Sequence, residues 1–224
     1  MKFITSSVGR KLLMAVTGVM MLCFIIIHML GNSTIFLGWL NAYAEHLHAL
    51  PPLVWAFRIV MLLLFGVHVF LGIQLSLENS AARPQAYAVK KDRRATFAGK
   101  NMIWTGVVIA GFLVYHILHF TLHVTNPALS AGMAGNVDTL GRPDVFKMVV
   151  LSFQQAGIAA MYIIAMIALA LHLSHGAQSF FQTLGLNTDK TIEVFEKIGV
   201  VAAVIFFIGY ASIPIAVFVG ILKG

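Results

Sequence analysis

The sequence predicts an all-α integral membrane protein, a single domain in which five transmembrane helices form a bundle. Hydrophobic residues make up 59% of the 224 positions and charged residues only 10%, whereas soluble domains average about 25% charged residues. Five apolar runs are each long enough to cross a bilayer, which takes roughly 20 residues. The predicted spans are residues 11–37, 53–77, 101–124, 146–176 and 197–222.

The segments around these runs justify each span in turn. The first run is too long for the apolar core of a signal peptide and no small-residue cleavage site follows it, so we expect a retained span. A polar connection over 38–52 ends in Pro51 and Pro52, which suit the first turn of the second helix. The polar stretch 78–100 is too short to be a domain of its own. From Ile198 to Leu222 the last run contains Pro214 and no charged residue or histidine, which indicates a packing role.

The distribution of lysine and arginine predicts the orientation, because basic residues accumulate on the cytoplasmic side of a membrane. The richer side holds Lys2, Arg10, Lys11, Arg83, Lys90, Lys91, Arg93, Arg94, Lys100, Lys190 and Lys197. The other side holds only Arg58, Arg142, Lys147 and Lys223. We therefore expect the N-terminus in the cytoplasm and the C-terminus outside.

Four of the five spans carry a histidine, and ionisable groups at membrane depth are costly enough to indicate function. The helix directions place His28 and His116 toward the outer side. They place His68 and His172 toward the cytoplasm. An outer and an inner pair of imidazoles predict two b-type haems, each with two axial histidines and hence suited to moving single electrons. The only cysteine, Cys23, excludes a Cys-x-x-Cys-His attachment, so the haems would be held non-covalently.

Other residues are candidates for contacts with these haems. Gly72 and Gly176 each follow a histidine by four residues, on the same helix face, and leave room for a flat macrocycle. His119 and His123 share a predicted helix face with His116, so one could bind iron while the others bond propionate, water or quinone. For Arg58 the alternatives are a haem propionate and a lipid phosphate reached by snorkelling. The expected haem contacts are Arg58, Gly72, Gly176, His119, His123, His175 and Ser179.

Two other classes of protein compete with a cytochrome. A proton-coupled transporter usually has carboxylates inside its spans or paired repeats, and the sequence indicates neither. A structural or assembly subunit would not need histidines sorted by depth.

Several segments resemble the single-polypeptide, five-helix dihaem cytochrome b anchor of succinate:quinone oxidoreductases, that is, succinate dehydrogenases and fumarate reductases. The segments are 28–38 (HMLGNSTIFLG), 41–45 (NAYAE), 104–106 (WTG), 115–116 (YH) and 172–185 (HLSHGAQSFFQTLG). The resemblance implies one axial pair from the first and third helices and another from the second and fourth. It favours His172 over His175, four residues before a glycine, and His116 over His119, ten residues after a Thr-Gly pair.

The resemblance also implies partners and a location. A flavoprotein subunit with FAD and an iron–sulfur subunit would dock on the cytoplasmic face of a bacterial inner membrane, with membrane lipid around the bundle. The basic loop at 78–100 fits an acidic partner, anionic lipid or the ordinary positive-inside bias. The quinone would be menaquinone, a homodimer of complexes is compatible with the family, and no nucleic-acid partner is expected. Some relatives carry a glutamate two residues before the fourth-helix ligand; Ala170 stands there, so their proton pathway is not expected.

A quinone needs an acid or base near the membrane surface. The first candidate is Glu45 on the outer side, where the match to a family glutamate is loose and a solvated loop carboxylate is the alternative. Its candidate neighbours are Tyr43, His46, His48 and His123. A site on the cytoplasmic side would use Ser174, His175 and Gln178.

Overall fold

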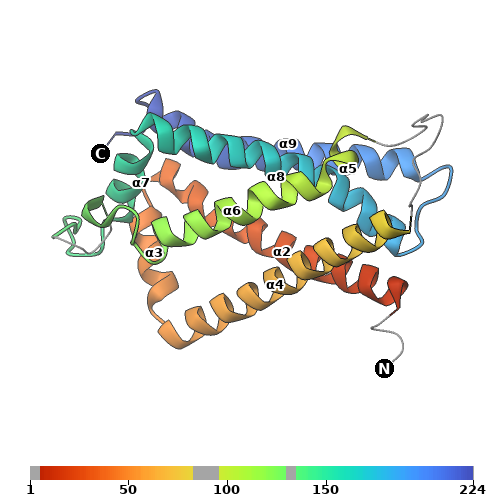
Figure 1. Cartoon of the computed structure of the whole chain (residues 1–224). Helices are drawn as coiled ribbons and strands as arrows, with labels where there is room; N and C mark the ends of the chain where they lie inside the picture. Colours follow the sequence, from red (N-terminus) through yellow and green to blue (C-terminus); the bar gives the residue numbers. More distant parts are fainter. Residues whose placement is uncertain (1–5, 83–95, 130–134, 224) are drawn as a thin grey trace.

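Five helices of the protein are long and apolar enough to cross a membrane (Figure 1). The computed structural model describes residues 6–82, 96–129 and 135–223. The five long helices are α2 (Ser7–Ser33), α4 (Pro51–Ala81), α6 (Met102–Phe120), α8 (Ala156–Thr183) and α9 (Ile192–Phe218). They confirm the predicted all-α bundle of five membrane helices.

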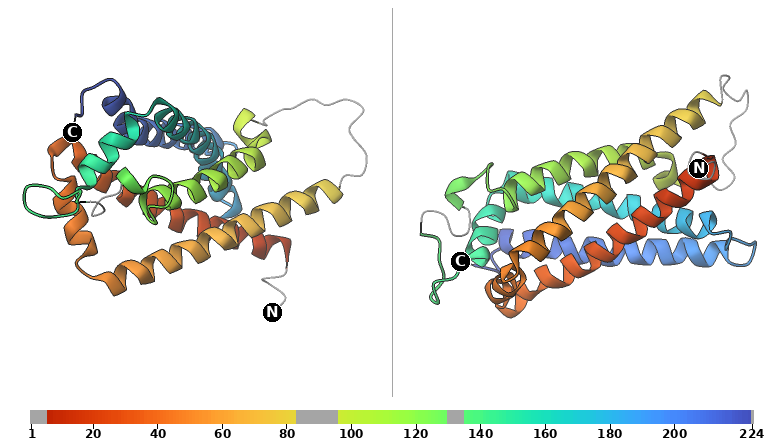
Figure 2. Two further views of the ribbon diagram at one scale, coloured as in Figure 1. Left: turned by 60° about the vertical axis from the view of Figure 1, so that its left-hand side comes forward. Right: turned by 90° about the horizontal axis from the view of Figure 1, so that it is seen from below.

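Shorter helices mark the two ends of the bundle. They are η1 (Thr34–Leu37), α3 (Leu40–His48), α5 (Phe97–Lys100), η2 (Pro127–Leu129) and α7 (Val145–Phe153). We call the end with α3 and α7 the α7 end, and the opposite end, with α5, the α5 end (Figures 1 and 2). The chain starts at the α5 end and finishes at the α7 end, as an odd number of crossings requires.

Local sequence explains where several helices begin. The Ser6 hydroxyl accepts a hydrogen bond from the Gly9 amide at 3.0 Å and caps α2. Pro51 and Pro52 occupy the first turn of α4, as predicted. The Asp144 carboxylate accepts the Lys147 amide at 2.9 Å and caps α7.

The predicted fourth span, 146–176, is wrong at both ends. Gln155 has an extended backbone (φ −80°, ψ 110°), which separates α7 from α8, and α8 then continues to Thr183. Val150 and Phe153 on α7 are buried in the hydrophobic core, together with Ile35 and Leu40 from the η1–α3 region. The apolar character of residues 145–153 therefore reflects burial at the α7 end rather than the start of a membrane crossing.

Two connections also differ from prediction. The segment 38–52 contains α3, which Asn41 ties to the start of α7: its side chain accepts the Phe146 amide at 2.8 Å and donates to Asp144 at 3.0 Å. The third span ends at Phe120 rather than 124, and His123 has a left-handed backbone (φ 56°). His123 therefore does not share a helix face with His116, contrary to prediction.

The remaining spans shift at their ends. The second extends to Ala81, and the fifth begins at Ile192 and ends at Phe218. The basic loop lies largely outside the described residues, since only Lys100 among its six basic side chains is described. Lys2, also used in the orientation prediction, lies outside them too.

The last helix packs closely on its neighbours. Gly199 of α9 lies against the Ser174 carbonyl of α8, where a Cβ would overlap the backbone. The Tyr210 hydroxyl donates to the Ile25 carbonyl of α2 at 2.6 Å. Small residues at such contacts let membrane helices approach each other.

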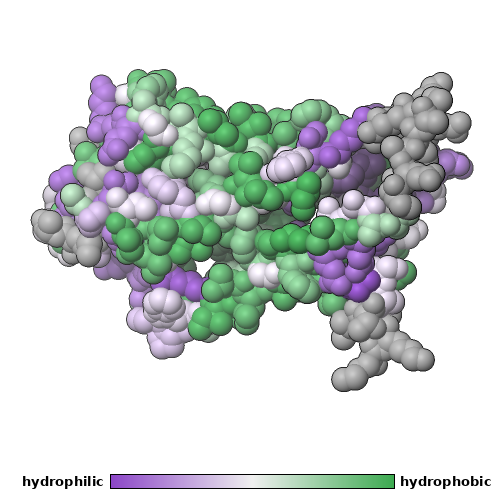
Figure 3. Space-filling view, in the orientation of Figure 1, coloured by the Kyte–Doolittle hydropathy of each residue, from purple (hydrophilic) through white to green (hydrophobic). Residues whose placement is uncertain are grey.

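Large apolar side chains are exposed along the spans, including Leu62, Leu63 and Phe70 of α4. Hydrophobic residues cover much of the middle of the molecule in Figure 3, and hydrophilic residues gather mainly toward its ends. Such an apolar surface is suited to the hydrocarbon core of a bilayer. Backbone N–H and C=O groups have no water to bond there and must form their hydrogen bonds within the helices.

Candidate functional site: two histidine pairs

The four membrane histidines meet in two pairs. The ring centroids of His28 on α2 and His116 on α6 lie 5.9 Å apart. Those of His68 on α4 and His172 on α8 lie 6.3 Å apart. We call the first the α7-end pair and the second the α5-end pair. Each pair joins helices that are distant in sequence, so each forms only when the bundle folds.

At the α5-end pair, a threonine hydroxyl holds the ring of His68. Thr17 Oγ1 lies 3.1 Å from His68 Nδ1, and the hydroxyl is within donating distance of the Leu13 and Met14 carbonyls, at 2.9 and 3.0 Å. Because the hydroxyl proton is directed to a carbonyl, Oγ1 is the acceptor for the His68 Nδ1–H. The proton on Nδ1 leaves Nε2 with the lone pair, which is the form that binds a metal.

His172 has the same arrangement on the other side of this pair. Its Nδ1 lies 3.2 Å from Thr105 Oγ1, and the Thr105 hydroxyl donates to the Met102 carbonyl at 2.9 Å. Both histidines of the α5-end pair are therefore presented as the tautomer with Nε2 available.

Glycines lie beside these two rings. A Cβ on Gly18 would be 3.4 Å from His68 Cε1, and one on Gly106 would be 3.5 Å from His172 Cε1. Gly72 and Gly176, predicted to leave room for a macrocycle, face the methyl groups of Met14 and Met102 instead, which would lie 3.9 and 3.7 Å from a Cβ at these glycines.

These matching surroundings reveal an internal repeat, so the prediction of no repeat is wrong. Residues 14–30 and 102–118 have Met, Thr, Gly, Val, Phe, His and Leu at the same relative positions, with a constant offset of 88. The motif His-x-x-x-Gly-x-Gln occurs at His68 and again at His172. Each half, α2 with α4 and α6 with α8, supplies one histidine to each pair. Parallel repeats also occur in transporters, so the argument from a missing repeat no longer excludes that class.

The α7-end pair has different surroundings. The Asn32 amide lies 3.1 Å from His28 Nε2, and the Tyr162 hydroxyl lies 3.3 Å from His116 Nδ1. Phe24 stacks on His28 with ring centroids 5.3 Å apart, and Phe112 lies 5.8 Å from His116. This pair therefore lies among aromatic rings rather than between threonines.

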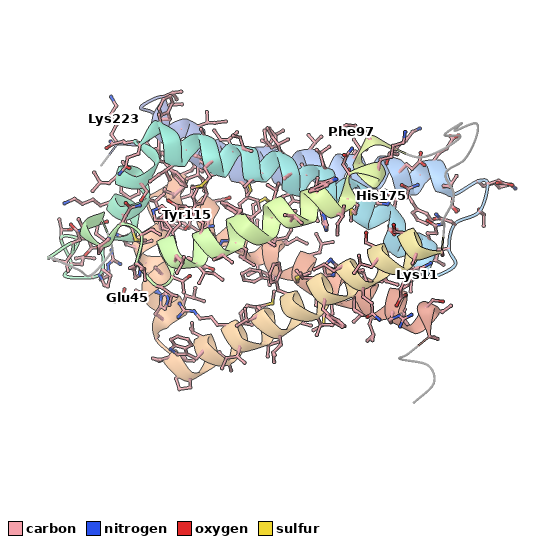
Figure 4. All side chains as sticks on the ribbon, viewed as in Figure 1. Lys11, Glu45, Phe97, Tyr115, His175 and Lys223 are labelled. Carbon is pink, nitrogen blue, oxygen red and sulfur yellow. The ribbon has the colours of Figure 1, made fainter. Side chains whose placement is uncertain are left out.

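The geometry separates the alternative histidines from the paired ones. His119 is 3% exposed, and both its ring nitrogens are hydrogen-bonded: Nδ1 to Tyr162 at 3.0 Å and Nε2 to Ser152 at 3.1 Å. His116, not His119, contacts His28. His175 lies against Gly99 of α5, and its buried Nδ1 has no hydrogen-bond partner among the described residues. Figure 4 shows His175 at the α5 end with Phe97 and Lys11.

Basic side chains gather around the start of α4, at the α7 end. Arg58 Nη2 lies 3.5 Å from His48 Nε2, and its guanidinium lies 5.0 Å from the centre of the Trp55 ring. Burial and the nearby positive charge of Arg58 lower the pKa of His123. The buried Nδ1 of His123 lacks a partner in the described part of the chain, where Arg58 has no carboxylate partner either. These groups suit an anionic ligand group.

The candidate quinone residues are not gathered into one site. Glu45 Oε2 lies 3.5 Å from Arg142 Nη1 and its side chain is 53% exposed, at the same end as Tyr115 in Figure 4. Tyr43, two residues away on α3, packs over Gly31 instead. His46 and His48 fold back onto α3, where their Nδ1 atoms lie 2.7 and 2.8 Å from the Ala42 and Ala44 carbonyls.

The candidates predicted for the cytoplasmic side are mostly hydrogen-bonded to other residues of the helices. Ser174 donates to the Leu171 carbonyl at 2.8 Å, and Gln178 donates to Glu196 of α9 at 2.9 Å. Ser179 is half-buried on α8, and its carbonyl accepts the Thr183 hydroxyl at 2.8 Å.

Sequence reasoning missed Thr17, Thr105, Tyr162 and Ser152 as neighbours of the histidines. For the two threonines the repeated Met-x-x-Thr-Gly-Val motif would have identified them. For Tyr162 and Ser152 no pattern in the sequence brings α7 and α8 to α6.

No protein-family model, curated protein or solved structure matches the chain.

The histidine pairs fit haem iron. Two imidazole–metal bonds of about 2 Å, with roughly 1 Å from each nitrogen to its ring centre, place the ring centres about 6 Å apart. The observed 5.9 and 6.3 Å agree with that spacing. With a proton on Nδ1, His123 and His175 would each offer an N–H donor to a haem propionate, which accepts hydrogen bonds.

Proposed function

We propose that the chain is the membrane anchor of a succinate:quinone oxidoreductase, a cytochrome b subunit with two haems that each have two histidine ligands. The observation that carries the proposal is the α5-end pair: two imidazoles from different helices, 6.3 Å apart, each with its Nδ1 on a threonine hydroxyl. A histidine that served only packing would not need its tautomer fixed in this way. The repeat provides that support twice.

The residues of the chain would bind and orient two haem b groups. His68 and His172 would ligate one iron, and His28 and His116 the other. A bound haem supplies one-electron redox chemistry. Thr17 and Thr105 orient the first two imidazoles, while Arg58 and His123 provide donors for a propionate at the α7 end. His175 provides the corresponding group at the α5 end.

The Asn32 side chain would have to move before His28 Nε2 could bind iron, because the Asn32 amide donates a hydrogen bond to that nitrogen at 3.1 Å. A neutral imidazole has one lone pair on the unprotonated nitrogen, so iron and the amide compete for it. Asn32 is one turn from His28 on α2, and a change of its rotamer frees the nitrogen without moving the helix.

The dicarboxylate chemistry would take place in a partner flavoprotein with FAD. An iron–sulfur subunit would pass electrons to this chain at the cytoplasmic face of a bacterial inner membrane. The segments at 28–38 and 172–185 support this assignment through their resemblance to the family, and 172–185 is the most specific of the segments. Menaquinone would accept or donate the electrons in the membrane.

Glu45 is the proposed acid–base group for the quinone. Its carboxylate is half-exposed, so it can exchange protons with water, and Arg142 holds it at 3.5 Å. His123, on the connection that follows α6, is the second candidate for contact with the quinone. Tyr43 is a weaker candidate because its ring packs over Gly31.

The test is isolation of the intact complex from membranes through a tag on this chain. We expect a flavoprotein and an iron–sulfur protein to co-purify, and succinate to reduce a b-type absorbance band. Glu45→Gln should abolish turnover with quinone while both haem spectra and the reaction with an artificial electron acceptor persist. Haem with other partners would indicate a different quinone-linked oxidoreductase, and a complex without haem would refute the proposal. Normal quinone turnover in Glu45→Gln would move the quinone site to the Ser174, His175 and Gln178 side.

A further inference from the structure

A buried row of hydrogen bonds leads away from His116. Tyr162 of α8 places its hydroxyl 3.3 Å from His116 Nδ1 and 3.0 Å from His119 Nδ1. The other nitrogen of His119 lies 3.1 Å from the hydroxyl of Ser152 on α7. Ser152 is 0% exposed, His119 3% and Tyr162 7%. Four side chains from three helices are therefore connected, three of them buried and His116 partly buried.

If His116 binds iron through Nε2, the proton positions in this row follow. Nδ1 of His116 then carries a proton and donates to the Tyr162 oxygen. The Tyr162 hydroxyl has one proton, which it donates to His119 Nδ1. His119 then carries its proton on Nε2 and donates to Ser152. From His116 to Ser152 each N–H and the Tyr162 O–H is donated to the next residue, so these three hydrogen bonds run in a single direction.

We propose that Tyr162, oriented by His119 and Ser152, is a positioning residue that sets the donor strength of His116 and thereby the redox potential of the α7-end haem. This inference rests on the proposed function. The acceptor for the ligand's Nδ1–H is a phenol that itself donates to an imidazole. Rows of hydrogen bonds in a low dielectric polarise one another, so the Tyr162 oxygen is a strong acceptor.

The effect on the iron has a definite sign. A stronger acceptor for Nδ1–H makes the imidazole more basic, which stabilises the ferric state. Removing the Tyr162 hydroxyl should therefore favour the ferrous state. The α5-end haem should not respond, because its ligands bond to Thr17 and Thr105 instead.

Tyr162→Phe is the direct test, because it removes the hydroxyl and keeps the ring among Phe112 and Phe153, each 4.9 Å away. The measurement is a redox titration of the intact complex, with the two haem signals assigned by His116→Ala and His172→Ala. We expect the α7-end haem to shift to a more positive potential by about tenfold in its ferrous-to-ferric ratio, roughly 59 mV for one electron. The α5-end haem should keep its potential.

Two further variants make the result decisive. Ser152→Ala should shift the same haem in the same direction by a smaller amount, since it acts through His119. The matched control, Thr105→Val, should change only the α5-end haem. An unchanged α7-end potential in Tyr162→Phe, or an equal shift of both haems, would overturn the inference. If Tyr162→Phe loses the α7-end haem, Ser152→Ala decides: a positive shift supports the inference and no shift overturns it. A wild-type complex without haem would instead refute the proposed function.

Discussion

The α5-end and α7-end pairs use histidines at equivalent positions of one repeat, yet their surroundings differ. At the α5 end the same threonine and glycine occur on both sides of the pair. At the α7 end His28 meets an asparagine and His116 meets a tyrosine. The two halves of the repeat therefore give the two histidines of the α5-end pair the same neighbours, and the two histidines of the α7-end pair different neighbours.

The difference between the two pairs begins at positions where the two halves of the repeat no longer have the same residue. Gly31 and His119 occupy equivalent positions, with the same offset of 88. Gly31 leaves room for the Tyr43 ring of α3, while His119 reaches Ser152 of α7. The short helices at the α7 end thus pack on different residues of the two halves. In the proposed cytochrome, this difference in surroundings would give two chemically identical haems different properties.

Among the changes that test this comparison, removal of an axial histidine should have the largest effect. His68→Ala or His172→Ala should eliminate the α5-end haem, and His28→Ala or His116→Ala the α7-end haem, since one remaining histidine leaves an axial position vacant. The haem content per chain and the reduced absorbance spectrum measure the loss. Retention of both haems in His116→Ala together with loss of one in His119→Ala would mean that His119 is the ligand.

Filling a glycine beside the α5-end pair should be nearly as damaging. Gly106→Leu adds a branched side chain to a position where a Cβ alone would already be in contact with His172 Cε1, at 3.5 Å, so its outer atoms would compete with the ring for space. Gly111→Leu on the same helix is the matched control, because no atom of another described residue packs within 4 Å of a Cβ there. We expect the first variant to lose the α5-end haem and the second to keep both. Equal haem contents in the two variants would contradict the proposed role of Gly106.

Replacing the two threonines should affect haem binding less, but it compares the two halves of the repeat directly. Thr17→Val and Thr105→Val each remove one acceptor for an Nδ1–H, and loss of such a partner typically weakens metal affinity about 10–100-fold. Because the repeat supplies both, we expect similar losses, confined to the α5-end haem. The rate of haem transfer to a haem-scavenging protein measures them. A loss at the α7 end would show that the threonines act on the whole bundle.

The smallest expected effect concerns pH at the α7 end. The hydrogen bond from Arg142 lowers the pKa of Asp138 to about 2 from its ordinary 3.8. A carboxylate with a depressed pKa stabilises the folded state above its unfolded pKa and loses that contribution as the pH falls through its folded pKa. Asp138→Asn should therefore lower the thermal midpoint slightly above about pH 4, and the difference should vanish as the pH approaches about 2. A difference that grows with acidification would contradict this assignment.

Much of the fold could be read from hydrophobicity, because each span must be apolar over its whole length. The depth of each histidine followed from the direction of its helix, and this was enough to predict which histidines would meet. Hydrophobicity could not reveal that residues 145–153 form a separate helix, since burial in a core and contact with lipid require the same residues. The left-handed backbone of His123 depends on how the chain leaves α6, which no periodicity records.

The residues that hydrogen-bond to the histidines were harder to predict from the sequence. Thr17 and Thr105 could have been found by aligning the two halves of the chain, which share Thr-Gly-Val ten residues before each histidine. Tyr162 and Ser152 could not, because their contact with α6 depends on the break at Gln155 and the angle at which α7 packs.

Counting haem in the purified wild-type chain tests most directly whether this bundle holds two haems, one at each histidine pair. Extracted haem should amount to two b-type haems per chain, and the oxidised spectrum should be that of six-coordinate iron without a free axial position. A preparation that is folded and helical but contains no haem, or only one per chain, would contradict the account.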